Sequence, residues 1–266
     1  VALIGAVARR LPVPMPILLI LAGVALSFEP HLEKLKLDPG FFFLLFIPPL
    51  LFAEGWQFPK REFVEFRYSI LMLAFGLVFA TVLVVGYVVH WLIPSIPLAA
   101  AFALGAVISP TDAVAVSKVI GDLKLPARTF IVLKGESLIN DATGLVAFKF
   151  AVAAVVTGSF SFNEATLDFI RLVGGGTLIG LIVAFVFQWV RLRLQHTDGE
   201  EPNVQIGLAL LTPFAAYLAA EEVEVSGILS VVAAGIYSGI DDTKHLRLEP
   251  RMKAWGVWGM VLYMLN

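Results

Sequence analysis

The polar sequence Ser-Pro-Thr-Asp occupies residues 109–112, inside an apolar run that extends from residue 98 to residue 117. Pro110 has no backbone N–H, and its ring clashes with the preceding turn, so we expect the helix to kink or unwind here. Opened backbone carbonyls are tolerated at membrane depth only where they face protein or a water-filled cavity. Asp112 adds carboxylate oxygens beside the break, and such oxygens suit a hard cation such as Na⁺. The alternative is a plain proline kink, with Asp112 reaching the cytoplasmic side near Lys118.

The composition indicates that the natural solvent of this chain is lipid. Of its 266 residues 59% are hydrophobic and 15% charged, and the mean hydropathy is +0.88. Globular chains are about 45–50% apolar and about 25% charged. The net charge of −2 excludes nucleic-acid binding through a strongly basic surface. The absence of cysteine excludes a disulfide framework and Cys-ligated zinc. No Walker A sequence is present, so we expect no nucleotide as the energy source.

Ten apolar runs follow one another, separated by charge clusters and by Pro or Gly. A helix that crosses about 30 Å of hydrocarbon needs roughly 20 apolar residues. None of the runs alternates as barrel strands do, so we predict an all-α, multi-pass helical bundle that forms a single transmembrane domain over residues 1–266. Since the first and last runs are incomplete, we expect this domain to be partial, truncated at both ends. The runs lie near residues 1–8, 12–28, 40–56, 68–93, 98–117, 127–157, 167–190, 204–220, 225–240 and 254–266.

Lysine and arginine divide the connecting segments into two alternating sets. One set carries 14 of the 19 basic residues, Arg191 and Arg193 among them, whereas the other carries only Lys34 and Lys36. The positive-inside rule places the rich set in the cytoplasm. Residues 9–10 (Arg-Arg) would alternatively fit a twin-arginine signal peptide. An apolar run precedes them, however, and the membrane character continues to the end of the chain.

A second polar stretch, Gly-Glu-Ser-Leu-Ile-Asn-Asp, occupies residues 135–141 in the long run 127–157. Its polar side chains are spaced so that they share one stripe of a helix surface. Ionisable groups inside a membrane cost about 2.5–3.5 kcal/mol each and usually line a pathway. In the alternative interpretation, Glu136 and Asn140 only hydrogen-bond neighbouring helices. The stripe contains Glu136, Ser137, Asn140, Asp141 and Gly144.

Three further features leave alternatives open. Glu54 is either an interfacial residue anchored by Trp56 or, if its helix extends further, a neighbour of the same cavity. Lys149 either pairs with a carboxylate on another helix or extends to the far side of the membrane. The glycines at 174–176 predict close helix packing rather than a phosphate-binding loop.

Taken together, these motifs resemble the monovalent cation/proton antiporter superfamily, specifically its sodium/hydrogen exchanger branch of the Asn-Asp type. The resemblance rests on residues 109–116 (SPTDAVAV) and 135–141 (GESLIND), with support from 48–54 (PPLLFAE) and 226–229 (SGIL). It implies the inverted-repeat sodium/proton antiporter fold, in which a core domain moves against a dimerisation domain. It also implies a homodimer in the plasma (inner) membrane that exchanges Na⁺, K⁺ or Li⁺ for H⁺, without a cofactor, in pH homeostasis.

The resemblance assigns an ion site to the matching positions. Asp141 is implied to be the principal ion- and proton-binding carboxylate, with Asp112 and Ser137 as further ligands. Thr111 is implied to offer its backbone carbonyl. Because many relatives carry proline where this chain has Ala113, we expect a milder unwinding of the helix.

The same resemblance gives supporting roles to three residues. Asn140 stands where electrogenic relatives carry a second aspartate, which implies electroneutral exchange. Glu136 is implied to be a structural partner of an arginine on a later helix, and Glu54 to contribute through water. We expect that arginine and a second broken helix beyond Asn266.

One carboxylate is enough for exchange in physical terms. Loss of water favours the uncharged form of a carboxylate and a bound cation favours the charged form, so Asp141 can hold a proton or a cation but not both well.

Two other functions fit parts of the pattern. A passive cation channel would use the same oxygens. An intramembrane aspartyl protease would let Asp112 and Asp141 share a proton, although its Gly-x-Gly-Asp signature is absent. We therefore expect a transporter rather than an enzyme.

Overall fold

The structure is a computed structural model that describes residues 15–28, 38–112, 126–158, 162–195, 202–245 and 248–265. Within these ranges every regular element is helical, which confirms the predicted all-α class. Five of the described helical segments are long and apolar enough to cross a membrane. The elements are α2 (Met15–Ser27), α3 (Pro39–Gln57), α4 (Lys60–Leu71), the π-helical η1 (Met72–Leu77), α5 (Val78–Leu92), α6 (Leu98–Ile108), α8 (Ala127–Thr157), α9 (Phe162–Gln195), α10 (Pro202–Glu222), α11 (Gly227–His245) and α12 (Leu248–Leu265).

The predicted apolar runs correspond to these helices in chain order, except that run 1–8 lies outside the described residues. Several helices are longer than their runs. The helix formed by α4, η1 and α5 already begins at Lys60, and α9 begins at Phe162. The reason is that backbone hydrogen bonding continues where the chain leaves the hydrocarbon, and polar side chains can reach water there. Apolar length therefore predicted the order of the helices better than their ends.

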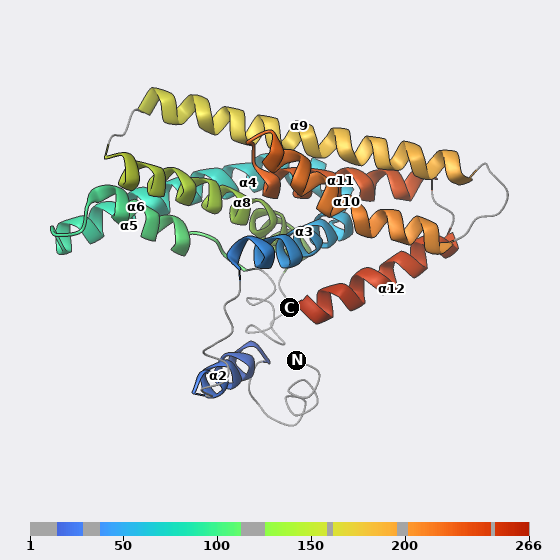
Figure 1. Cartoon of the computed structure of the whole chain (residues 1–266), viewed down its shortest axis with the longest axis horizontal. Coiled ribbons are helices and arrows are strands. Elements are labelled where there is room, and N and C mark those ends of the chain that lie inside the picture. The colour runs from blue at the N-terminus through green and yellow to red at the C-terminus, as the bar shows by residue number, and fades with distance from the viewer. Residues whose placement is uncertain are drawn as a thin grey trace.

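The helices from α3 to α12 form two groups (Figure 1). In the first, which we call the α8 group, α4, η1, α5 and α6 pack around α8. In the second, the α11 group, α3, α9, α10 and α12 pack around α11 or its neighbours. Helix α8 touches α3, α9 and α11 only sparingly. Most close helix contacts thus fall within a group, although one buried apolar core runs through both groups.

Small residues bring α9 close to the segment that leads into α11 inside the α11 group. A Cβ on Gly175 would lie 2.7 Å from Val225 Cγ1, and a Cβ on Gly176 would lie 2.5 Å from the carbonyl oxygen of Ser226. No described atom comes within 4 Å of a Cβ on Gly174. The predicted close packing is therefore confirmed for two of the three glycines.

A buried polar network ties α3, α9, α10 and α11 together. Trp56 Nε1 donates a hydrogen bond of 2.7 Å to Asp242 Oδ2, and an Arg191 guanidinium nitrogen lies 2.9 Å from Asp242 Oδ1. Arg191 also donates to Gln188 and Gln205. Trp56 and Arg191 are each 4% exposed. Trp56 is consequently not an interfacial anchor, and Arg191 lies inside α9 rather than in a loop, so both of these interpretations of the sequence were wrong.

Candidate functional site

Helix α6 ends at Ile108, and residues 109–112 are not helical. The N–H of Ser109 donates to the Gly105 carbonyl at 3.0 Å, and the Ser109 hydroxyl donates to the Ala106 carbonyl at 2.9 Å. Pro110 then has no N–H with which to continue the ladder. The predicted interruption is confirmed. The expectation of milder unwinding concerned Ala113, which lies outside the described residues.

Helix α8 passes very close to this break at Gly144. A Cβ on Gly144 would lie 2.7 Å from Pro110 Cγ and 3.3 Å from the Ala106 carbonyl oxygen. Only glycine permits such an approach without displacement of the proline ring. Asp141 lies one helical step before Gly144 on the same stripe. The carboxylate of Asp141 and Pro110 of the interrupted backbone thus line the same pocket.

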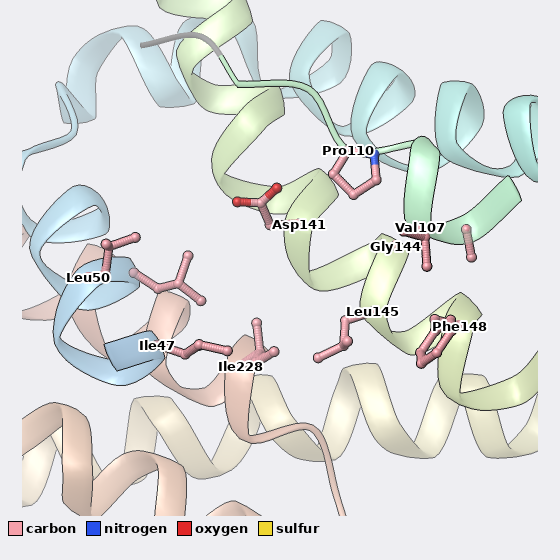
Figure 2. A pocket seen from close by; sticks show the side chains of 11 residues that line it. Ile47, Leu50, Val107, Pro110, Asp141, Gly144, Leu145, Phe148 and Ile228 are labelled. Atoms are coloured by element: carbon pink, nitrogen blue, oxygen red, sulfur yellow. The ribbon is translucent and has the colours of Figure 1, made fainter. Parts of the chain in front are cut away.

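Asp141 lines a pocket of ≈ 390 Å³ where the two helix groups meet (Figure 2). Asp141 contributes the one charged side chain of the lining, and Figure 2 shows its carboxylate between Leu50 of α3 and Pro110 of the break. The remaining lining is apolar or glycine, so the charge has few polar neighbours within the pocket wall. The lining comprises Ile47, Leu50 and Leu51 of α3, Ala106, Val107 and Pro110 at the end of α6, Asp141, Gly144, Leu145 and Phe148 of α8, and Ile228 of α11.

Three of the predicted residues join in one hydrogen-bonded cluster. The Thr111 hydroxyl donates to Glu136 Oε2 at 2.8 Å. The Asn140 amide nitrogen donates to Glu136 Oε1 at 2.6 Å and to Thr111 Oγ1 at 2.9 Å. Glu136 is 3% exposed and Asn140 is fully buried. The cluster fixes the non-helical stretch to α8, an arrangement that matches the alternative in which Glu136 and Asn140 hydrogen-bond a neighbouring segment. The sequence did not reveal that the hydroxyl of Thr111 takes part.

The other acidic residues surround Asp141 without forming a closed ligand shell. Glu54, Asp112 and Glu136 lie near enough for their charges to act on Asp141. Lys134 and Asp112 also lie near enough to act on Glu54, where the lysine favours the charged carboxylate and the aspartate disfavours it. Helix α3 extends to Gln57, and half-buried Glu54 interacts with the charge of Asp141, but it is not among the residues that line the pocket. In the described part of the chain no three acidic or histidine side chains are close enough to hold one metal ion.

Ser137 lies one turn before Asp141 on α8 and is half-buried, but it is not part of the pocket lining.

Further along the same helix, Lys149 Nζ lies 3.7 Å from Glu221 Oε1 of α10. Lys149 therefore pairs with a carboxylate on another helix, which decides between the two alternatives for this residue.

Comparison with known proteins supports the resemblance seen in the motifs. Residues 1–262 match the family described as "Sodium/hydrogen exchanger, transmembrane". The chain is 44% identical to the "Sodium, potassium, lithium and rubidium/H(+) antiporter" of Bacillus subtilis, over 100% of this chain and 40% of that protein. It is 43% identical to the uncharacterized Na(+)/H(+) exchanger YjcE of Escherichia coli, over 100% of this chain and 49% of that protein. The chain thus spans less than half the length of these two curated relatives.

The fold is also that of a solved structure. The sodium proton antiporter MjNhaP1 of Methanocaldococcus jannaschii superposes with a TM-score of 0.74 at 20% identity, over 99% of this chain and 64% of that one. At this identity the likeness concerns the fold alone. The match to the family over residues 1–262, the identity to its bacterial relatives and the helical fold agree. This multi-pass membrane chain belongs to the sodium/hydrogen exchanger family.

Proposed function

We propose that the protein containing this chain is a secondary active transporter that exchanges a monovalent cation, Na⁺ in the first place, for H⁺. The observation that carries this proposal is the position of Asp141. It is the one charged group in the lining of a pocket between the two helix groups, and it lies beside a helix break. The name of the Bacillus subtilis relative supports a substrate class that also includes K⁺ and Li⁺.

Exchange follows from competition at one carboxylate. An apolar surrounding favours the protonated form of a carboxylate, and a bound cation favours the charged form. Proton and cation therefore exclude one another at Asp141. If the α8 group moves against the α11 group only when this charge is neutralised, each passage carries either a cation or a proton. Transport then follows the two gradients by alternating access and needs neither a nucleotide nor an enzymatic reaction.

The surrounding residues have distinct roles in this proposal. Asp112, Ser137 and the carbonyl of Thr111 complete the cation's oxygen shell, and Glu54 acts through water. Support comes from the charge interactions of Asp112 and Glu54 with Asp141.

Asn140 and Glu136 instead hold the break against α8, and hydrogen bonds within their cluster support this role. Since Asn140 is uncharged, Asp141 is the single titrating member of the Asn-Asp pair, which favours electroneutral exchange. We include in the proposal one transmembrane domain over residues 1–266, a homodimer and the plasma membrane, because the motifs resemble those of exchangers with these properties.

Replacement of Asp141 tests the function directly. We expect Asp141→Asn in the full-length protein to abolish Na⁺-dependent proton flux in reconstituted vesicles, because asparagine can neither release a proton nor neutralise a cation. Asp168→Asn is the matched control, since it makes the same change at an exposed position of α9 away from the pocket. Gel filtration checks that both variants are folded. Flux retained in Asp141→Asn would refute the assignment.

A further inference from the structure

An ion pair connects the two helix groups. Lys149 Nζ of α8 lies 3.7 Å from Glu221 Oε1 of α10, so one partner belongs to each group. The buried pair between Arg191 and Asp242 differs, because both of its helices belong to the α11 group. A relative movement of the groups would leave the Arg191–Asp242 pair intact but would change the Lys149–Glu221 distance.

Each partner of this pair adjoins a residue that lines the pocket. Lys149 directly follows Phe148, which lines the pocket from α8. Glu221 Oε1 would lie 2.9 Å from a Cβ on Gly227, and Gly227 precedes Ile228, which lines the pocket from α11. The two partners thus lie next to opposite walls of the same pocket.

The pair lies on the rim of the pocket rather than at its base. Asp141 and Lys149 are eight residues apart, which is about 12 Å along an α-helix. The side chains of Lys149 and Glu221 are 54% and 40% exposed. Helix α8 starts after a segment that the charge pattern places in the cytoplasm, so its Lys149 end points to the opposite, outer side.

We propose that Lys149 and Glu221 form a latch across the outer rim of the pocket. The latch is closed in the conformation described here and opens when the α8 group moves against the α11 group. This inference rests on the proposed exchange function. Exposed ion pairs are individually weak, so the latch biases the populations of two conformations and does not lock either of them.

Cross-linking tests whether the rim moves during transport. Residues 1–266 contain no cysteine, so Lys149→Cys/Glu221→Cys adds one pair to a full-length protein whose other cysteines, if any, are replaced by serine. We expect a short bis-methanethiosulfonate cross-linker to lower Na⁺-dependent proton flux at least about tenfold, and dithiothreitol to restore it. The matched control is Tyr87→Cys/Phe102→Cys. It joins α5 to α6 inside the α8 group, where the two rings lie 5.4 Å apart, and should leave the flux unchanged.

Full cross-linking between positions 149 and 221 with unchanged flux would overturn the latch. Absence of flux from the unsubstituted protein would instead count against the exchange function. In that case the latch is tested by a measurement that does not depend on transport. This readout is the rate at which an impermeant thiol reagent, added outside, labels Leu145→Cys in the pocket lining.

Charge changes at the latch should alter this labelling rate. We expect Lys149→Gln or Glu221→Gln to speed labelling about two- to fivefold, because either change depopulates the conformation in which the two groups are held together at the outer rim. The exchanged pair Lys149→Glu/Glu221→Lys should restore the rate. Equal rates in all variants, labelling from the cytoplasmic side alone, or no restoration by the exchanged pair would each contradict the proposal.

Discussion

Among single residues, Gly144 is the one whose lack of a side chain lets α8 approach the helix break next to Asp141. The Pro110 ring occupies the space that a Cβ of residue 144 would take. This contact, together with the hydrogen bonds from Thr111 and Asn140 to Glu136, sets the position of the break relative to Asp141. The geometry around Asp141 therefore also depends on residues outside the pocket lining, such as Glu136 and Asn140.

We expect Gly144→Ala to lower the free energy of unfolding by about 1–3 kcal/mol, since the added methyl group forces Pro110 or α8 to shift. Gly174→Ala is the control, because its Cβ meets no described atom within 4 Å and alanine favours the helix. Thermal unfolding of the purified variants measures both effects. Equal melting temperatures for the two variants would contradict the close approach.

Much of the site was predictable at this scale, and the limits have a physical cause. Helical spacing alone placed Glu136, Asn140 and Asp141 on one stripe, because a regular helix fixes which residues share a face. The hydroxyl contact of Thr111 was not predictable, since it follows a break where no periodicity applies. The bond between Trp56 and Asp242 joins residues 186 positions apart, and no local pattern in the sequence signals it.

Among the helices, proline content does not by itself decide where a helix ends, and a buried polar network joins several of them. Helix α6 ends because proline removes a donor, whereas α3 contains Pro48 and Pro49 and continues to Gln57. Proline alone thus did not predict where a helix ends. Helices α3, α9, α10 and α11 are joined by the network around Arg191, whose charge is compensated by Asp242 and whose guanidinium group also donates hydrogen bonds to two glutamines.

Loss of this network should destabilise the fold. We expect Arg191→Met to lower the free energy of unfolding by about 3–5 kcal/mol, because Asp242 is 2% exposed and would remain as a buried charge without its cation. Arg193→Met, at the end of the same helix, should change it far less, since Arg193 stacks on the Trp189 ring and forms no ion pair with a described residue. Thermal unfolding distinguishes the two variants.

The double variant Arg191→Met/Asp242→Leu tests the reason for that loss. It removes both charges, so we expect it to recover most of the stability that Arg191→Met loses. If the double variant loses as much free energy of unfolding as the two single variants together, the loss comes from packing and not from the unpaired carboxylate.

At the scale of the whole molecule, the two helix groups explain why the pocket lies where it does. Its walls come from α6 and α8 on one side and from α3 and α11 on the other. Apolar length and loop charge predicted the helices and their order. They could not predict the grouping, because which faces of two membrane helices meet depends on small-residue contacts between distant segments, such as those between α9 and α11.

The proposed exchange requires a cation and a proton to compete for Asp141. The most direct measurement is proton release when Na⁺ is added to the purified full-length protein in weak buffer, followed with a pH-sensitive dye. The account predicts about one proton released per cation bound, and none from Asp141→Asn. Sodium binding without proton release, or equal release from Asp141→Asn, would contradict it.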